Sequence, residues 1–67
     1  MPSGTIGAEE RVKAKRKIVF GDGFEVAKGA LGTSAKRSGE VWAYIKFDAD
    51  TSDRQYRIVS RSDVVKV

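Results

Sequence analysis

The segment 40–47, Glu-Val-Trp-Ala-Tyr-Ile-Lys-Phe, constrains the fold more than any other part of the sequence. Its side chains alternate in character, and successive side chains of a β-strand point to opposite faces of a sheet. One face carries an apolar set, Val41, Ala43, Ile45 and Phe47. The opposite face carries Glu40, Trp42, Tyr44 and Lys46. The pattern therefore predicts a strand with one buried and one exposed face.

Two runs nearer the N-terminus also favour strands. A strand is expected from about Lys15, and a second β-prone run at 24–27 follows it after Gly21-Asp22-Gly23, which is typical of a hairpin turn. Residues 28–39 hold three glycines, two serines and a threonine. This composition predicts a long loop.

The C-terminal third predicts a return strand. After an acidic turn at 48–53, residues 55–60 are expected to pair with 40–47, with Ile58 facing the core. Residues 61–63 are expected to form one 3₁₀ turn before a short last strand at 64–67. The core expected from all these patterns consists of seven side chains: Val26, Val41, Ala43, Ile45, Phe47, Ile58 and Val65.

A chain of 67 residues is long enough for one domain with a thin core. It contains no cysteine and no histidine, which excludes disulfides and removes the usual zinc ligands. We expect residues 1–10 to form a disordered tail and residues 11–67 to form a single all-β domain. Four or five short strands are too few for two full sheets and favour a small, strongly bent barrel.

This outline resembles the SH3-like small barrels, the class that includes KOW and Tudor modules. The points of resemblance are the Gly-Asp-Gly-Phe-Glu-Val run at 21–26, the loop 28–38, the segments 39–42 and 45–48, and the ending 61–67. The resemblance implies an SH3-like barrel preceded by an N-terminal arm. Such barrels include Tudor modules that bind methylated side chains and accessory subunits that bind protein, so the resemblance leaves the function open.

The sequence lacks the usual catalytic groups. Without histidine or cysteine the common pairs of nucleophile and base are missing, so no enzymatic activity and no cofactor are expected. Asp48, Asp50 and Asp53 are close enough in sequence to bind a divalent cation. A calcium loop beginning at Asp48 would need Gly and Glu where Asp53 and Val59 stand, so a solvated turn is the better interpretation and no metal site is expected.

Rings and cations share the exposed face of the strand at 40–47. Trp42 and Tyr44 lie two residues apart with Lys46 next in the row, and Arg57 is expected on the same sheet face from the partner strand. Flat rings beside cations suit base stacking and phosphate pairing with a nucleic acid. The alternative places Trp42 under the long loop and pairs Tyr44 across strands, so that both rings stabilise the fold.

Positive charge is concentrated in the first two thirds of the chain. Residues 11–46 contain nine Lys or Arg and three Asp or Glu, a net charge of +6 within a chain of net charge +4. The cations of this region that suit contact with phosphate are Lys13, Lys15, Arg16, Lys17, Lys36 and Arg37. The alternative is that lysines of an edge strand are simply solvated and oppose aggregation.

The function expected from the sequence is that of a small basic nucleic-acid-binding module. It would contact the phosphate backbone of DNA or RNA with limited sequence specificity. The alternative is a protein-interaction module, either an accessory subunit or inhibitor docked on a larger complex, or a Tudor-like peptide binder using Phe24, Trp42, Tyr44 and Tyr56. A monomer or homodimer is expected. No signal-peptide pattern and no membrane-spanning run occurs, so an intracellular protein, cytoplasmic or nuclear, is expected.

Overall fold

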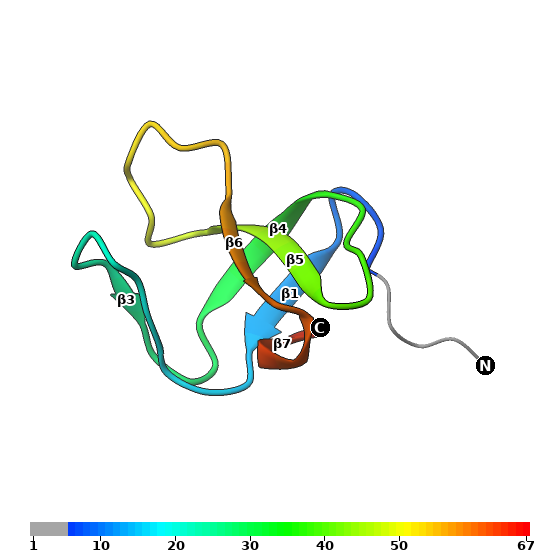
Figure 1. The fold of residues 1–67 in the computed structure, drawn as a ribbon, viewed down its shortest axis with the longest axis horizontal. Coiled ribbons are helices and arrows are strands. Elements are labelled where there is room, and N and C mark those ends of the chain that lie inside the picture. Colours follow the sequence, from blue (N-terminus) through cyan, green and yellow to red (C-terminus); the bar gives the residue numbers. More distant parts are fainter. Residues whose placement is uncertain (1–5) are drawn as a thin grey trace.

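The computed structural model describes residues 6–67, and this range is all-β (Figure 1). It contains seven short strands and one 3₁₀ turn, where the sequence predicted four or five strands. The elements are β1 (Arg11–Ala14), β2 (Ile18–Val19), β3 (Glu25–Val26), β4 (Leu31–Lys36), β5 (Trp42–Phe47), β6 (Arg57–Ser60), η1 (Arg61–Asp63) and β7 (Val64–Lys66). Residues 6–67 include no helix that is long and apolar enough to cross a membrane.

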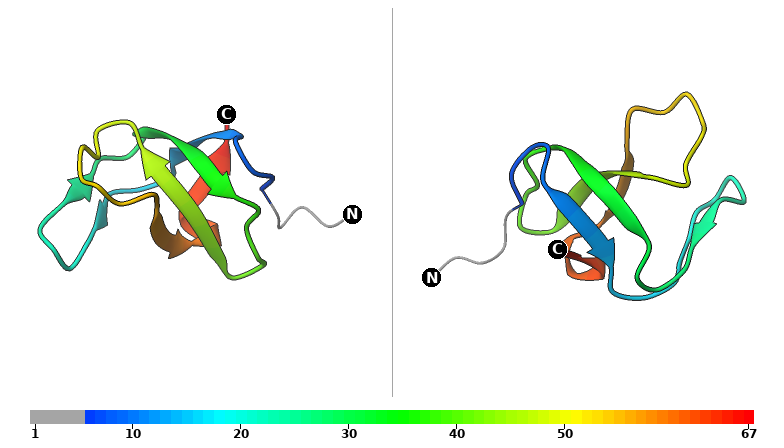
Figure 2. Two further views of the ribbon diagram at one scale, coloured as in Figure 1. Left: turned by 90° about the horizontal axis from the view of Figure 1, so that it is seen from above. Right: turned by 180° about the vertical axis from the view of Figure 1, so that it is seen from behind.

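Five strands form one antiparallel sheet in the order β6-β5-β4-β1-β7, and β2 pairs with β3 in a second, two-stranded sheet. The larger sheet bends strongly. As a result β1 lies behind β5 in Figure 1 and turns toward the viewer in the right-hand view of Figure 2. The bend gives the molecule two outer sides, one formed by β5 and β6 and the other by β1 with the adjoining part of β4.

Strands β1 to β4 form one long hairpin that is symmetric about Asp22. Arg11 pairs with Thr33 near its base, and Ile18 pairs with Val26 near its tip. In each pair the two residues lie equally far from Asp22 in the sequence, so both halves of the hairpin share one register. The predicted turn at Gly21-Asp22-Gly23 therefore forms the tip of a hairpin that is much longer than expected.

A kink separates the two halves of this hairpin at residues 15–17 and 27–30. The Ala14 amide donates a hydrogen bond to the Ala30 carbonyl (2.9 Å), and the Ala14 carbonyl accepts one from the Gly29 amide (2.8 Å). One residue thus faces two, the arrangement of a β-bulge, which bends a strand. Gly29 has a φ of +90°, which glycine adopts without steric cost.

Strand β4 lies within the segment 28–39, so the prediction of a loop there is wrong for Leu31–Lys36. The inward positions of β4 hold small residues, because Gly32 and Ser34 are the buried ones. A Cβ atom at Gly32 would lie 2.8 Å from the Ile45 Cγ2 atom, so glycine allows β4 to approach β5 closely. Such a strand lacks the large apolar residues by which strands are recognised in sequences.

The core contains the buried apolar side chains of the described residues: Ile6, Val12, Ala14, Val26, Ala43, Ile45, Phe47, Val59 and Val64. Four of the seven expected members are confirmed, namely Val26, Ala43, Ile45 and Phe47. The other three are wrong, because 63% of Val41, 56% of Ile58 and 36% of Val65 is exposed. The face assignment of 40–47 therefore holds from Ala43 onward and fails at Val41, which precedes β5.

The two faces of β6 are the reverse of those expected. Arg57 and Val59 are buried, whereas Ile58 is exposed. Ile58 and Val59 are consecutive apolar residues, so their side chains point to opposite faces of the strand. The alternation alone therefore does not show which face of β6 is buried. The buried phase includes a charged side chain, which is tolerated because carboxylates compensate it.

The N-terminal segment also differs from expectation. Ile6 is fully buried, its amide donates to the Ser38 hydroxyl (2.7 Å), and its carbonyl accepts from the Ser38 amide (2.8 Å). The Glu9 amide donates to the Ser34 carbonyl (2.6 Å). Residues 6–10 are therefore attached to the domain, in place of the disordered tail expected for 1–10, and residues 1–5 lie outside the described residues.

Candidate nucleic-acid interface

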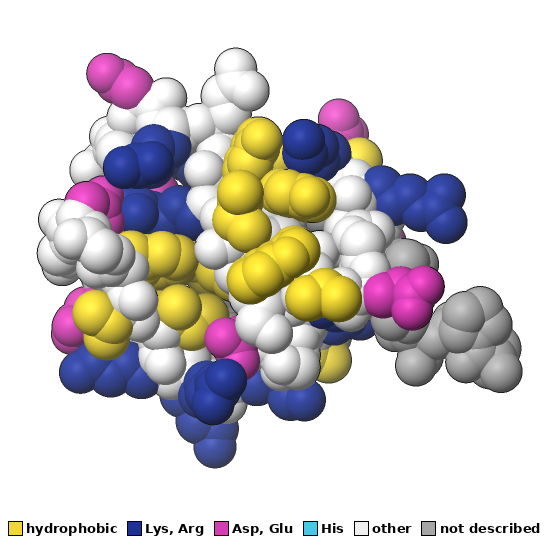
Figure 3. All heavy atoms as spheres, in the orientation of Figure 1, with side chains coloured by type: hydrophobic (Ala, Val, Ile, Leu, Met, Phe, Trp, Pro, Cys, Tyr) yellow, Lys and Arg dark blue, Asp and Glu magenta, His cyan; other side chains and the backbone are white. Residues whose placement is uncertain are grey.

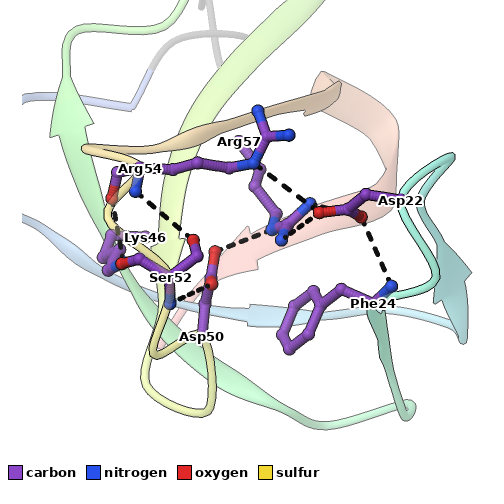
Figure 4. Close-up of polar contacts among 7 residues, drawn as sticks. All are labelled: Asp22, Phe24, Lys46, Asp50, Ser52, Arg54 and Arg57. Atoms are coloured by element: carbon purple, nitrogen blue, oxygen red, sulfur yellow. Dashed lines mark hydrogen bonds and ion pairs between the residues drawn. The ribbon is translucent and has the colours of Figure 1, made fainter.

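Arg57, a predicted phosphate contact, is instead committed to the interior. Only 7% of the residue is exposed. Its Nε donates to Asp50 (2.7 Å), and its two terminal nitrogens donate to the two carboxylate oxygens of Asp22 (3.0 and 2.9 Å), as Figure 4 shows. The guanidinium also lies over the rings of Phe20 and Phe24, at 4.7 and 4.4 Å from their centroids. With its donors occupied, Arg57 has a structural role and is unsuited to pairing with phosphate.

This arginine joins three segments that are distant in the sequence. Asp22 stands at the tip of the long hairpin and accepts a further hydrogen bond from the Phe24 amide (3.3 Å). Asp50 belongs to the loop between β5 and β6 and accepts from the Ser52 amide (3.1 Å). Because Arg57 begins β6, its guanidinium holds both the hairpin tip and the loop against that strand.

The same contacts perturb the acidities of the two carboxyl groups. Hydrogen bonds from Arg57 lower the pKa of Asp22 below its usual range, and those from Arg57 and then Ser52 lower the pKa of Asp50 strongly. A carboxylate that accepts charge-assisted hydrogen bonds is stabilised in its ionised form. Both aspartates are therefore ionised at neutral pH, as the contact with Arg57 requires.

Aromatic and aliphatic side chains gather on the outer side of β5 and β6, where Figure 3 shows a hydrophobic patch bordered by Lys and Arg side chains. We call this surface the aromatic face. It consists of Trp42, Tyr44, Tyr56, Ile58 and Lys36. Trp42 is 53% exposed and Ile58 is 56% exposed, whereas both tyrosines are half-buried. The sequence alternatives for the two rings are thus separated, with Trp42 exposed and Tyr44 packed against its neighbours.

Lys36 completes this surface. The Tyr44 and Tyr56 rings meet edge to face at 5.3 Å, and the Lys36 ammonium lies 4.5 and 5.0 Å from their centroids. Lys46, on the same face of β5, donates to the carbonyls of the loop residues Ser52 (3.0 Å) and Arg54 (2.9 Å). Neither lysine forms an ion pair with Asp or Glu within the described chain.

The four-ring pocket of the Tudor-like alternative is divided between two clusters. Phe24 stacks on Phe20 at a centroid distance of 5.7 Å and contacts the Arg57 guanidinium. Tyr44 and Tyr56 instead pair with each other under Lys36. Three of the four rings predicted to converge on one peptide thus contact two different cations of the chain itself, Phe24 with Arg57 and the two tyrosines with Lys36.

A hollow of about 460 Å³ adjoins the aromatic face. Its walls come from the hairpin tip at 20–22, from Arg54 and from residues 56–58. Tyr56 and Ile58 therefore border both the hollow and the aromatic face, which makes the side of β6 one continuous candidate surface. Ile58 was expected in the core, because the two faces of β6 are the reverse of those predicted.

The predicted basic run of residues 13–17 lies on another side of the molecule. Lys13 points outward from β1 and pairs with the exposed residues Leu31 and Val65 on the neighbouring strands. Arg16 forms an ion pair with Asp63, and Lys17 lies 3.5 Å from Glu25. Lys15 is exposed at the kink, and Arg37 is exposed just after β4. The structure therefore divides the predicted site into a group near β1 and a group on the aromatic face.

Two of the three aspartates that the sequence offered as metal ligands have arginine partners. Asp48 accepts two hydrogen bonds from Arg11 (2.9 and 2.7 Å), and Asp50 is held by Arg57. Comparison of the chain with protein-family models, with curated proteins and with solved structures gave no match.

Proposed function

We propose that this chain is a small nucleic-acid-binding module that holds its ligand on the aromatic face. The observation that carries the proposal is the exposure of Trp42 on the aromatic face, which also carries Lys36, a lysine that forms no ion pair within residues 6–67. A large apolar side chain exposed in a patch with a charged border is typical of a binding surface. A base that stacks on one ring contributes about 1–3 kcal/mol.

We also propose that the fold is of the SH3-like barrel kind. The order of elements supports this assignment: a long first hairpin, three consecutive antiparallel strands β4 to β6, and a 3₁₀ turn before the short last strand. In this arrangement the aromatic face is the outer surface of the three-stranded part. Fold alone does not specify the ligand, so the function rests on the side chains.

The residues of the aromatic face, together with the cations Arg37 and Lys46, have separable roles in the proposal. Trp42 stacks on a base, and Ile58 supplies an adjoining apolar contact. Lys36, Arg37 and Lys46 attract the phosphate backbone. The face offers few groups that read base edges, so binding is expected to be weakly selective for sequence.

The chain's single tryptophan makes the experiment direct. Trp42 fluorescence should be quenched when short DNA or RNA oligonucleotides are added at low salt. Trp42→Ala, followed with labelled oligonucleotides, should weaken binding by about 1–3 kcal/mol while leaving the salt dependence unchanged, because a ring releases no counterions. Val19→Ala is the matched control, since Val19 is 65% exposed on β2, away from the aromatic face. Absence of binding to both DNA and RNA at low salt would refute the proposal.

One observation favours a second function, docking on a protein partner. Val41, Trp42 and Ile58 are all more than half exposed, and two of them are aliphatic. Aliphatic side chains gain little from stacking but much from an apolar protein surface. A protein partner should remain bound at salt concentrations that release nucleic acid, because apolar contacts are not screened.

A further inference from the structure

We propose that the chain carries a second phosphate-binding surface at the base of the long hairpin, so that one molecule holds two nucleic-acid segments together. This surface consists of Lys13, Lys15 and Lys28, which we call the hairpin-base lysines. The inference rests on the proposed function, because it assigns a second contact to the same class of ligand.

The Lys and Arg residues of the chain differ in whether they form ion pairs. All thirteen Lys and Arg residues of the chain lie within the described residues. Six of them form ion pairs with Asp or Glu: Arg11, Arg16, Lys17, Arg54, Arg57 and Lys66. The hairpin-base lysines do not, and neither do Lys36, Arg37 and Lys46 near the aromatic face. Positive charge without an acidic neighbour is therefore divided between two places.

The hairpin-base lysines lie close together along the two arms of the hairpin and are exposed. Lys13 alternates along β1 with the buried residues Val12 and Ala14, so its side chain points away from the core. Lys15 and Lys28 are exposed on the two arms of the hairpin where the Ala14 carbonyl accepts from the Gly29 amide (2.8 Å). Lys13 lies on β1, which is behind β5 in Figure 1, and Lys15 and Lys28 lie on the two arms that continue from this part of the hairpin.

Duplex DNA is stiff compared with the size of this domain. The domain measures only 22 and 19 Å along its two shorter axes. A DNA duplex resists bending over about 150 base pairs, so one duplex on the aromatic face cannot curve around so small a body to reach β1. The hairpin-base lysines are thus available to a second duplex, and charge complementarity selects phosphate as the partner.

The experiment measures bridging between two duplexes. A biotinylated 30-base-pair duplex is fixed on beads, the chain is added at low salt, and retention of a second, fluorescent duplex is recorded. Wild type should retain it. The triple variant K13Q/K15Q/K28Q should still bind a single duplex but lose most of the retention. The control R11Q/K17Q/K66Q removes the same charge from ion-paired positions and should keep bridging.

Each other outcome is informative. If K13Q/K15Q/K28Q bridges as well as wild type, the hairpin-base lysines are not the second surface and the inference is overturned. The inference is also overturned if sedimentation shows that bridging requires a dimer. It is overturned as well if wild type binds one duplex but never retains a second. If wild type binds no duplex even singly while Trp42 is quenched by single strands, bridging of duplexes fails but the proposed function stands. If no nucleic acid binds at all, both fall together.

Discussion

Two cations of this chain lie over pairs of aromatic rings, and they differ in burial and in the number of acidic partners. Arg57 contacts Phe20 and Phe24 at 4.7 and 4.4 Å from the ring centroids. Lys36 contacts its own pair of rings at 4.5 and 5.0 Å. Arg57 is buried with two carboxylates, whereas Lys36 is exposed and has no acidic partner in the described chain. The same type of contact thus occurs once as a structural link and once on a candidate binding surface.

The chemistry of the two side chains explains the division. A guanidinium presents five donors in a rigid plane, so Arg57 can satisfy Asp22 and Asp50 while it lies over the rings of Phe20 and Phe24. The ammonium of Lys36 is a compact, strongly hydrated charge that costs more to bury. Number of partners and exposure, more than ring contact itself, therefore decide which cation stabilises the fold.

The largest expected effect comes from removing the structural cation. Arg57→Met leaves Asp22 and Asp50 without their partner, and Asp50 is almost fully buried. We expect a markedly lower melting temperature and a partly unfolded chain at 25 °C, measured by circular dichroism. Arg54→Met is the control, since the exposed Arg54 lies 3.6 Å from Asp22 and should melt close to wild type. Similar melting of both variants would remove the distinction between the two cations.

A second prediction compares the loss of stability on the inner face of β5 with that on the outer face of β6, using an isoleucine-to-alanine substitution at each. Ile45→Ala removes a side chain that is fully buried and should cost about 2–5 kcal/mol. Ile58→Ala removes the same atoms from a residue that is 56% exposed and should change stability by about 0.5 kcal/mol or less. Urea unfolding measures both values. Equal losses would mean that the faces of β6 are wrongly assigned.

Acid should destabilise the fold by protonating the aspartates that Arg57 and Arg11 hold. Arg57 lowers the pKa values of Asp22 and Asp50 in the folded chain, and Arg11 lowers that of Asp48. Below about pH 4 the unfolded chain therefore binds protons that the folded chain does not, so the stability present above this pH is lost as the pH falls. Urea unfolding between pH 7 and pH 2 should show this decline.

The aspartate control is Asp53→Asn. Asp53 is exposed and forms no ion pair within residues 6–67. This variant should follow the wild-type decline, whereas Asp50→Asn should flatten it. Stability that stays constant from pH 7 to pH 2 would show that the contacts of Arg57 contribute nothing measurable.

Removing the exposed cation should have only a small effect on stability. Lys36→Met retains the aliphatic stem over the tyrosine rings and removes the charge, which should cost less than about 1 kcal/mol. Binding to duplex DNA should weaken for every sequence, and the slope of log K against log salt should decrease by about 0.9. An unchanged slope would place the phosphate elsewhere and weaken the assignment of the aromatic face.

Sequence patterns predict the all-β architecture, the tip of the hairpin and the inward face of Ala43, Ile45 and Phe47, because alternation there is strict and local. They do not predict β4, whose inward positions hold small residues such as Gly32. Nor do they predict the burial of Arg57, since its partner Asp22 is 35 residues away. What local patterns miss is decided by contacts between distant segments.

The candidate site was predictable in its chemistry but not in its layout. The alternation of 40–47 places Trp42 on the outer side of β5, as the structure has it. The run at 13–17 reads as one basic patch, yet only contacts with Glu25 and Asp63 reveal that Lys17 and Arg16 are paired. Which cations remain without an acidic neighbour depends on tertiary structure, and so does the side of the molecule that each one occupies.

The symmetry of the long hairpin about Asp22 restricts how its length can change. Deleting one residue from a single arm would shift the pairing between β1 and β4 relative to that between β2 and β3, and would turn Val26 or Val12 away from the core. Adding residues to both arms would preserve pairing but carry Asp22 past Arg57. We therefore expect a change in the length of one arm alone to disrupt one of the two pairings.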